Sequence, residues 1–250
     1  MSNELVRYTV VDGVGEIALN RPESANAFSL QLATELRTAA AAARNDDQVR
    51  AVLLTGEGHR FCAGGDVAEM AAADDRSAFL HRLAEVTDLA LLEVCDMTKP
   101  VVVAVQGAVA GAGLGLMLAG DIIVAEPNTK FVTAYASVGL TPDCGVSCLL
   151  PRAVGQVRAL ELLLLNRVVT AETAVDWGLV TSVAVNATAE ARAIARTFAS
   201  GPSFALGEAR RLVREAWQRS RAETGAAETL TISTAVNQPE AQDLIARFVK

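Results

Sequence analysis

The segment VVVAVQGAVAGAGLGLMLAG, residues 101–120, decides between a membrane helix and a buried strand followed by a turn and a short helix. It is apolar with a single exception, and three of its glycines have the GxxxG spacing found in packed membrane helices. Its first five residues, however, are rich in valine, as in a buried parallel strand. Five glycines in twenty residues would each also cost a single helix roughly 1 kcal/mol. The segment therefore predicts a strand, a glycine turn and a short buried helix, with no membrane partner.

Outward from this segment, the pattern predicts an α/β core followed by helices. Val6–Val11 and Val14–Leu19 flank an Asp-Gly turn signal and predict a β-hairpin. Ser29 is a candidate N-cap for a helix that ends near Arg44. We expect further strands at 49–55, 101–105 and 121–125, and helices at 77–94, 113–119, 156–165, 171–177, 189–199, 203–219 and 222–235, with Thr170 and Thr188 as caps.

Composition and charge exclude several classes of function. The 250 residues are 51% hydrophobic and 20% charged, and carry a net charge of −7 with no basic run, which argues against a nucleic-acid partner. Four cysteines form no CxxC pair, and only two histidines are present, so no metal site is expected. The first seven residues contain no apolar segment of the kind a signal peptide needs, and a cytoplasmic location is expected.

Two glycine-rich turns follow separate apolar strands and are the first candidates for chemistry. They are Ala63-Gly64-Gly65-Asp66 and Gly111-Ala112-Gly113, and each is expected to lead into a helix. Unpaired N–H groups at such positions favour negative charge, and two of them aimed at one point would form an oxyanion hole. Alternatively, the glycines only permit tight turns. Neither turn spells GxGxxG or GxxxxGK[ST], so no dinucleotide cofactor is expected.

The order of these motifs along the chain resembles the crotonase (enoyl-CoA hydratase/isomerase) superfamily. The resemblance covers nearly the whole chain. The segments that carry it are Phe61–Asp66, Lys99–Gly107, Gly111–Gly115, Asp121–Ala125, Phe131, Gly139–Asp143, Leu150–Arg152, Gly155 and Ala174–Val180. It implies an α/β fold built as a spiral of ββα units over residues 1–190, a C-terminal α-helical trimerisation region over 191–250, and a homotrimer or hexamer. It also implies an acyl-CoA thioester substrate, with coenzyme A as part of the substrate and no separate cofactor.

By the same resemblance, the N–H groups of Gly65 and Ala112 would hold the oxygen of a thioester enolate. Ala112 stands where the family usually has glycine, which is acceptable if its φ is negative. The remaining substrate-binding positions that the resemblance implies are Ser24, Ala25, Ala27, Ala63, Gly64, Asp66, Val67 and Tyr135.

The acidic residues distinguish between the family's reactions. Hydratases of the family use two glutamates, and the corresponding positions here are Gly115 and Tyr135, neither of which supplies a carboxylate. Asp143 remains, within a motif that resembles the enoyl-CoA isomerases that include 1,2-epoxyphenylacetyl-CoA isomerase. The resemblance therefore implies that Asp143 shuttles a proton while a double bond moves.

Several alternatives stay open at this point. Asp143 could instead cap a helix that starts near Cys144. The same aspartate position is the nucleophile of 4-chlorobenzoyl-CoA dehalogenase, but that enzyme also needs a histidine within a stretch that corresponds here to 85–92, which has none. Three further hypotheses remain: hydration through another group, other crotonase chemistry, and acyl-CoA binding without catalysis.

Overall fold

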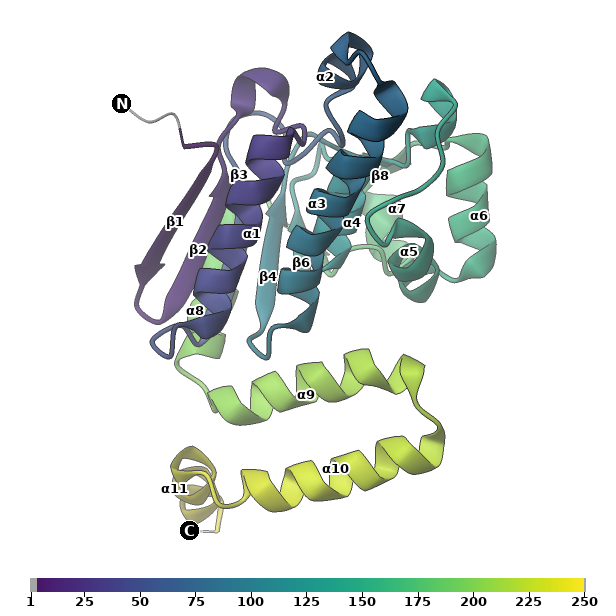
Figure 1. Cartoon of the computed structure of the whole chain (residues 1–250). Helices are drawn as coiled ribbons and strands as arrows, with labels where there is room; N and C mark the ends of the chain where they lie inside the picture. The colour runs from purple at the N-terminus through teal and green to yellow at the C-terminus, as the bar shows by residue number, and fades with distance from the viewer. Residues whose placement is uncertain (1–3, 250) are drawn as a thin grey trace.

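The computed structural model describes residues 4–249 as a mixed α/β molecule followed by a helical arm (Figure 1). The strands are β1 Val6–Val11, β2 Val14–Leu19, β3 Ala51–Gly56, β4 Val101–Val105, β5 Ala108–Ala110, β6 Ile122–Ala125, β7 Lys130–Val132, β8 Val169–Thr170 and β9 Ser182–Val183. The helices are α1 Leu30–Asn45, α2 Val67–Ala72, α3 Arg76–Asp96, α4 Ala112–Leu118, α5 Val146–Val154, α6 Gln156–Leu165, α7 Ala171–Asp176, α8 Ala187–Ala199, α9 Ser203–Glu215, α10 Arg221–Ala235 and α11 Pro239–Phe248.

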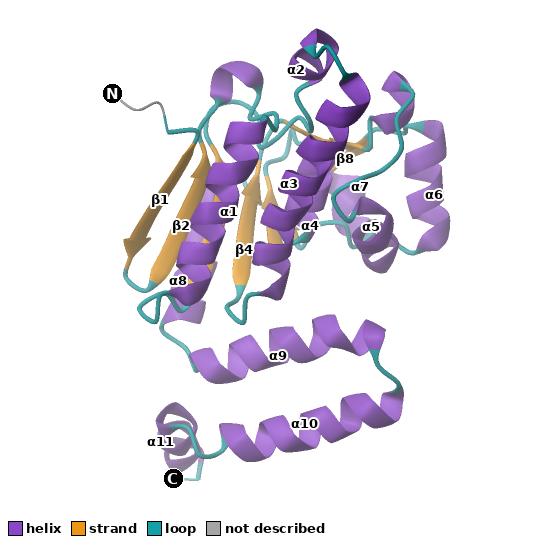
Figure 2. Cartoon of the chain, viewed as in Figure 1, coloured by secondary structure: helices purple, strands orange, loops and turns teal. Residues whose placement is uncertain are grey.

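The main sheet has the strand order β1-β2-β3-β4-β6-β9. β1 and β2 pair antiparallel, and the remaining neighbours pair parallel. The predicted hairpin is confirmed, and its two turn residues, Asp12 and Gly13, have φ of 52° and 77°, as a tight two-residue turn requires. The parallel order places the carboxyl ends of β3 and β4 at one edge of the sheet (Figure 2). The first glycine-rich loop follows β3 at this edge, and the second follows β5, which begins shortly after β4 ends.

Helices cover the main sheet on both faces. α1 and α3 pack side by side on one face (Figure 1). Ser29 caps α1 as predicted, because its Oγ accepts a hydrogen bond from the Leu32 N–H at 3.1 Å. α8 covers the other face with alanines at every fourth position, which bring its backbone close to the strands. These alanines are Ala187, Ala191, Ala195 and Ala199.

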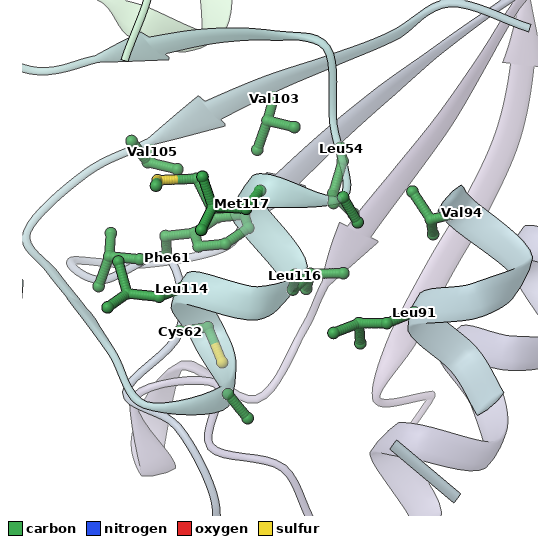
Figure 3. Packing of buried hydrophobic residues seen from close by; sticks show 14 of the residues in the cluster. Leu54, Phe61, Cys62, Leu91, Val94, Val103, Val105, Leu114, Leu116 and Met117 are labelled. Carbon is green, nitrogen blue, oxygen red and sulfur yellow. The ribbon is translucent and has the colours of Figure 1, made fainter. Parts of the chain in front are cut away.

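The segment 101–120 forms a buried strand, a turn and a short helix, as predicted. All of β4 and all of α4 are buried. Figure 3 shows α4 between the valines of β4 and the leucine and valine side chains of α3. In the described part of the chain, no helix is long and apolar enough to cross a membrane. The membrane-helix interpretation is therefore rejected by the packing of α4 inside the core.

A second, three-stranded sheet, β5-β7-β8, lies beside the main one and was not predicted. Its strands are two or three residues long, so they carry too little periodicity to be recognised in the sequence. β5 pairs parallel with β7, and β7 pairs antiparallel with β8. This sheet matters for the site because β5 leads directly into the second glycine-rich loop.

Helices α9, α10 and α11 extend from the core, and we call residues 203–248 the helical arm (Figure 1). Thr170 caps α7 as predicted. The predicted Thr188 cap is wrong, because Asn186 caps α8 by accepting from the Ala189 N–H at 2.9 Å. A division at 190/191 remains our proposal; that position lies inside α8. Residues 1–3 and 250 of the two proposed regions lie outside the described residues.

Candidate active site

Backbone hydrogen bonds hold the first glycine-rich loop to the segment after β2. The Phe28 N–H donates to the Gly64 carbonyl at 2.7 Å, and the Asp66 N–H donates to the Phe28 carbonyl at 2.9 Å. Asp66 then begins α2, since its Oδ1 accepts from the N–H groups of Ala68 and Glu69 at 3.0 and 3.1 Å. These bonds hold the backbone on both sides of Gly65, whose own N–H has no partner among residues 4–249.

The second glycine-rich loop closely approaches the first. A Cβ atom added to Gly111, whose φ is 50°, would lie 3.5 Å from the Gly64 Cα. Ala112 follows as the first residue of α4 and has a negative φ, so the condition for accepting alanine in place of glycine is met. The Ala112 N–H likewise has no hydrogen-bond partner in the described chain. Two unpaired N–H groups therefore come from two adjoining loops.

Both loops line one pocket, together with Asp143 and residues of α2, α3 and the 133–140 segment. The walls are mostly apolar. The lining residues are Phe28, Ala63, Gly64, Gly65, Asp66, Val67, Met70, Leu80, Leu83, Thr87, Gly111, Ala112, Thr133, Ala134, Tyr135, Val138, Leu140 and Asp143. The structure thus brings the three predicted catalytic residues, Gly65, Ala112 and Asp143, into one cavity.

The Asp143 carboxylate is held by a tyrosine. The Tyr135 hydroxyl donates a hydrogen bond to Asp143 Oδ1 at 2.7 Å, and Tyr135 is only 9% exposed. Burial, and then the Asp143 charge, raises the pKa of the Tyr135 phenol, so Tyr135 stays a donor throughout the working pH range. Asp143 does not cap a helix: α5 begins after Gly145, with no side-chain cap.

The position of the first hydratase glutamate is closed by the backbone. Gly115 lies inside α4, and a Cβ atom added there would lie 2.5 Å from the Cys144 carbonyl oxygen and 3.1 Å from Leu91 Cδ2. Cys144 itself adopts a left-handed φ of 49°. The chain next to Asp143 therefore occupies the space that a glutamate side chain at residue 115 would need.

Sequence reasoning missed a polar residue of α3 at this site. Thr87 lines the pocket and is 1% exposed. Asp88 follows Thr87 on α3 and does not line the pocket; burial, and then the Asp143 charge, raises its pKa. The helix was predicted, but only the packing of α3 against α4 shows which of its faces meets the pocket.

Comparison with known proteins agrees with this geometry. The family model described as enoyl-CoA hydratase/isomerase matches residues 9–250. The chain belongs to the enoyl-CoA hydratase/isomerase family. A 1,2-epoxyphenylacetyl-CoA isomerase of Escherichia coli is 36% identical over 220 residues, which cover 85% of this chain and 83% of that protein. A 4-chlorobenzoyl coenzyme A dehalogenase of Arthrobacter is 35% identical over 241 residues, or 95% and 87% of the two chains.

Hydratases and solved structures of the family match as well. A probable enoyl-CoA hydratase of Rhodobacter capsulatus is 36% identical over 208 residues, covering 82% of this chain and 79% of that protein. The crystal structure of a putative enoyl-CoA hydratase/isomerase from Mycobacterium abscessus superposes with a TM-score of 0.94 at 35% identity, covering 98% and 96% of the two chains. The predicted crotonase-like α/β fold is thereby confirmed.

In this family member, some of the other expected substrate-binding residues lie on a groove that adjoins the pocket. Ser24 and Ala27 line the groove together with Asp66 and Val67, which also face the pocket. Ala25 has a left-handed φ of 54°, and its carbonyl accepts from the Ala63 N–H at 3.1 Å. The groove also contains a cationic side chain that sequence reasoning missed.

That cation is Arg21, which is held by protein groups. Its Nη1 donates to Asp66 Oδ2 at 2.6 Å and to the Ala27 carbonyl at 3.1 Å. Asn26, also missed, is fully buried and donates to the carbonyls of Glu57 and Arg60 at 2.9 and 2.8 Å. Both side chains fix the loop between β2 and α1, which forms one wall of the groove.

The thiols near the pocket are poor nucleophiles. Burial raises the pKa of Cys62 to about 12. Burial and the Asp143 charge likewise raise the pKa of Cys144. Both thiols therefore stay protonated at neutral pH and act as packing groups. Within residues 4–249, no cluster of three His, Cys, Asp or Glu side chains could hold a metal ion.

Proposed function

We propose that the protein is an enoyl-CoA isomerase in which Asp143 moves a proton while the N–H groups of Gly65 and Ala112 stabilise an enolate oxygen. The observation that supports this most directly is the hydrogen bonding of the carboxylates in the pocket. Of the two that line the pocket, Asp66 uses both oxygens within the protein, whereas Asp143 keeps Oδ2 without a partner among the described residues. One carboxylate beside two unpaired N–H groups is sufficient for a proton shuttle.

In the proposed reaction, a 3-enoyl thioester places its carbonyl oxygen at the two N–H groups. Asp143 Oδ2 removes a proton from the α carbon, and the electron pair of that C–H bond delocalises into the thioester as a dienolate. The carboxylic acid then returns the proton to the γ carbon. The double bond has moved from the β,γ to the α,β position, and Asp143 is again ionised. Each N–H donor is expected to lower the barrier by about 3 kcal/mol.

Hydration by the family's two-glutamate arrangement is disfavoured by the same geometry. The first glutamate position, Gly115, cannot take a side chain without displacing the Cys144 carbonyl, and the second is Tyr135, which already donates to Asp143. No carboxylate pair is left to position and activate a water molecule. Acyl-CoA binding without turnover requires that Asp143 transfers no proton, which the experiment below measures.

A second candidate is nucleophilic substitution on an aromatic acyl group, with Asp143 as the attacking carboxylate. The similarity to the Arthrobacter dehalogenase favours it. The absence of histidine from residues 85–92 of α3 argues against it, because the ester intermediate would lack a base to activate water. We therefore favour proton transfer.

We further propose that the coenzyme A part of the substrate follows the groove beside the pocket. Ser24, Ala25, Ala27, Ala63, Gly64, Asp66 and Val67 would contact it, largely through backbone groups, and Tyr135 would contact the acyl group. Coenzyme A belongs to the substrate, and no separate cofactor is proposed. The groove and the pocket share Asp66 and Val67, so one extended ligand can occupy both.

We also propose the homotrimer or hexamer implied by the family resemblance. Large apolar side chains lie exposed on the helical arm, where an isolated chain would leave them in water. They are Leu230, Ile232, Val236, Leu244, Ile245 and Phe248.

The test is Asp143→Asn, assayed with 3-hexenoyl-CoA. We expect the isomerisation rate to fall by at least about 100-fold, because the amide cannot accept and return the proton. The dissociation constant of hexanoyl-CoA should change by less than about threefold, since a saturated ligand needs no proton transfer.

Asp88→Asn is the matched control, because it makes the same change at a neighbouring carboxylate that does not line the pocket. It should retain more than about a tenth of the wild-type rate. An Asp143→Asn rate within tenfold of wild type would remove Asp143 from the mechanism. Rapid hydration of crotonyl-CoA, or release of chloride from 4-chlorobenzoyl-CoA, would replace the proposed reaction by one of the alternatives.

A further inference from the structure

Helix α2 separates the groove from the pocket, and it lies against α3 at the end of the molecule opposite the helical arm (Figure 1). Ala68, Glu69 and Ala72 line the groove, whereas Met70 lines the pocket. Val67, at the start of the helix, lines both. Residues three or four apart share one face of a helix, so Val67 and Met70 lie on the side that faces the pocket. A thioester whose coenzyme A part follows the groove therefore has its acyl chain on the opposite side of α2.

The pocket has a buried floor beside the groups proposed to react. Phe28, Leu83 and Tyr135 line the pocket and are 1%, 4% and 9% exposed. Leu83 Cδ2 lies 3.9 Å from the point where a Gly65 Cβ would be, and Tyr135 bonds Asp143. The α, β and γ carbons of a bound acyl group would therefore lie over this floor.

Beyond the floor, the walls of the pocket remain apolar but become accessible to water. Leu80 precedes Leu83 on α3 by three residues, or about 4.5 Å along the helix axis. Val138 is 51% exposed, and Met70, Leu80 and Leu140 are half-buried. We call these four pocket-lining side chains, Met70, Leu80, Val138 and Leu140, the outer rim. They come from α2, α3 and the 133–140 segment, so the outer rim bounds the pocket on more than one side.

The outer rim offers a bound ligand only hydrocarbon contacts. Single exposed apolar side chains are common on proteins, but several that line one cavity mark a surface that a ligand covers. An acyl chain that ends at the γ carbon would leave the outer rim in water. A longer hydrocarbon chain would remove these side chains and its own methylenes from water together, and each fully buried methylene tightens binding by about fourfold.

We infer that the preferred substrates are 3-enoyl thioesters whose hydrocarbon chain continues beyond the γ carbon and packs on the outer rim. This inference rests on the proposed function, because it takes the pocket as the acyl site. The outer rim then sets specificity for chain length and does not transfer the proton. Contacts far from the reacting carbons are the same in the ground state and the transition state, so they lower KM and leave kcat nearly unchanged.

The test measures the dissociation constants of saturated thioesters, from butanoyl-CoA to dodecanoyl-CoA, by calorimetry. In the wild type, decanoyl-CoA should bind at least about tenfold more tightly than hexanoyl-CoA, since its further methylenes are partly buried. Val138→Ser and Met70→Gln place polar groups on the outer rim, and each should reduce this ratio by at least about threefold. With 3-decenoyl-CoA and 3-hexenoyl-CoA as substrates, the same ratio should appear in KM.

Val185→Ser is the matched control, because it makes the same change at a valine that is 88% exposed and lies outside the pocket. It should leave the affinity ratio unchanged. The inference is overturned if the wild-type ratio is smaller than about tenfold. It is also overturned if neither Val138→Ser nor Met70→Gln reduces the ratio by the expected amount, because the longer chain would then bind elsewhere.

These outcomes are separate from those of the proposed function. Asp143→Asn should show the wild-type affinity ratio, because the ratio compares two saturated ligands that undergo no proton transfer. If no CoA thioester binds at all, the acyl-CoA function itself is wrong. If thioesters bind and isomerise without regard to chain length, only the inference on chain length is wrong.

Discussion

Tyr135 and Asp143 form the pair on which the proposed chemistry depends. The tyrosine bonds one carboxylate oxygen, Oδ1, and leaves Oδ2 for the substrate. Because Tyr135 is buried, its ring position is fixed, and with it the direction of the carboxylate. We regard Tyr135 as a positioning residue.

Replacing Tyr135 with phenylalanine separates positioning from packing. We expect kcat/KM to fall by about tenfold to 100-fold, since one hydrogen bond to a charged group contributes roughly 1.5–3 kcal/mol. The dissociation constant of hexanoyl-CoA should change by less than about threefold, since the ligand makes no use of the carboxylate's direction. A loss of hexanoyl-CoA binding as large as the loss of kcat/KM would reduce Tyr135 to a packing group.

At the scale of elements, the first glycine-rich loop and α2 depend on Asp66. Its carboxylate caps α2 and pairs with Arg21. Burial by itself would raise the pKa of Asp66, but the hydrogen bonds from Glu69, Arg21 and Ala68 outweigh burial and hold the pKa below its usual range. This pairing stabilises the fold above the unfolded pKa of about 3.9 and is lost as the pH falls through the lower, folded value.

Asp66→Asn should therefore cost stability in a pH-dependent way. Asparagine still caps a helix, so the loss comes from the Arg21 pair, and we expect about 1–2 kcal/mol at pH 7 by urea unfolding. The difference from wild type should shrink when the pH is lowered below the folded pKa of Asp66. Asp75→Asn, the same change at the exposed cap of α3, serves as control and should cost less than about 0.5 kcal/mol. A pH-independent loss at Asp66 would contradict the charge argument.

At the scale of the whole molecule, a buried arginine attaches the helical arm to the core. Arg210 of α9 is 8% exposed, and its Nε donates to Asp121 Oδ2 at 2.6 Å. Its two terminal nitrogens donate to carbonyls at the end of α3, including those of Val94 at 2.9 Å and Cys95 at 2.7 Å. These carbonyls have no partner within the helix, so Arg210 supplies the hydrogen-bond donors that the C-terminus of α3 needs. The same bonds join α9 to the core.

Arg210→Met should destabilise the whole fold by about 3 kcal/mol, since it leaves buried carbonyls and part of Asp121 unsatisfied. Arg211→Met is the matched control on the same helix, because Arg211 pairs with Glu208 and Glu215 at the surface. It should cost less than about 1 kcal/mol. Chemical unfolding of the two variants measures the difference, and equal losses would show that the arm is not attached through Arg210.

The sequence by itself determined the elements whose signals are local. The hairpin of β1 and β2, the strand β4 and the helix α6 have the predicted bounds, because alternation, valine content and helical periodicity act over a few residues. The Ser29 cap followed from its own side chain. The motifs also predicted which residues line the site, as far as the family resemblance reached: Gly65, Ala112 and Asp143 share one pocket.

Only the tertiary structure decided the features that depend on residues far apart in the chain. The short strands β5, β7 and β8 exist because they pair with one another, and their own sequences carry no period. The closure of position 115 by the Cys144 carbonyl, the bond from Tyr135 to Asp143 and the outer rim of the pocket arise where separate elements meet. Hydrophobic periodicity places a helix on the core but says little about its partners, because burial is non-directional whereas hydrogen bonds and close contacts are specific to the packed arrangement.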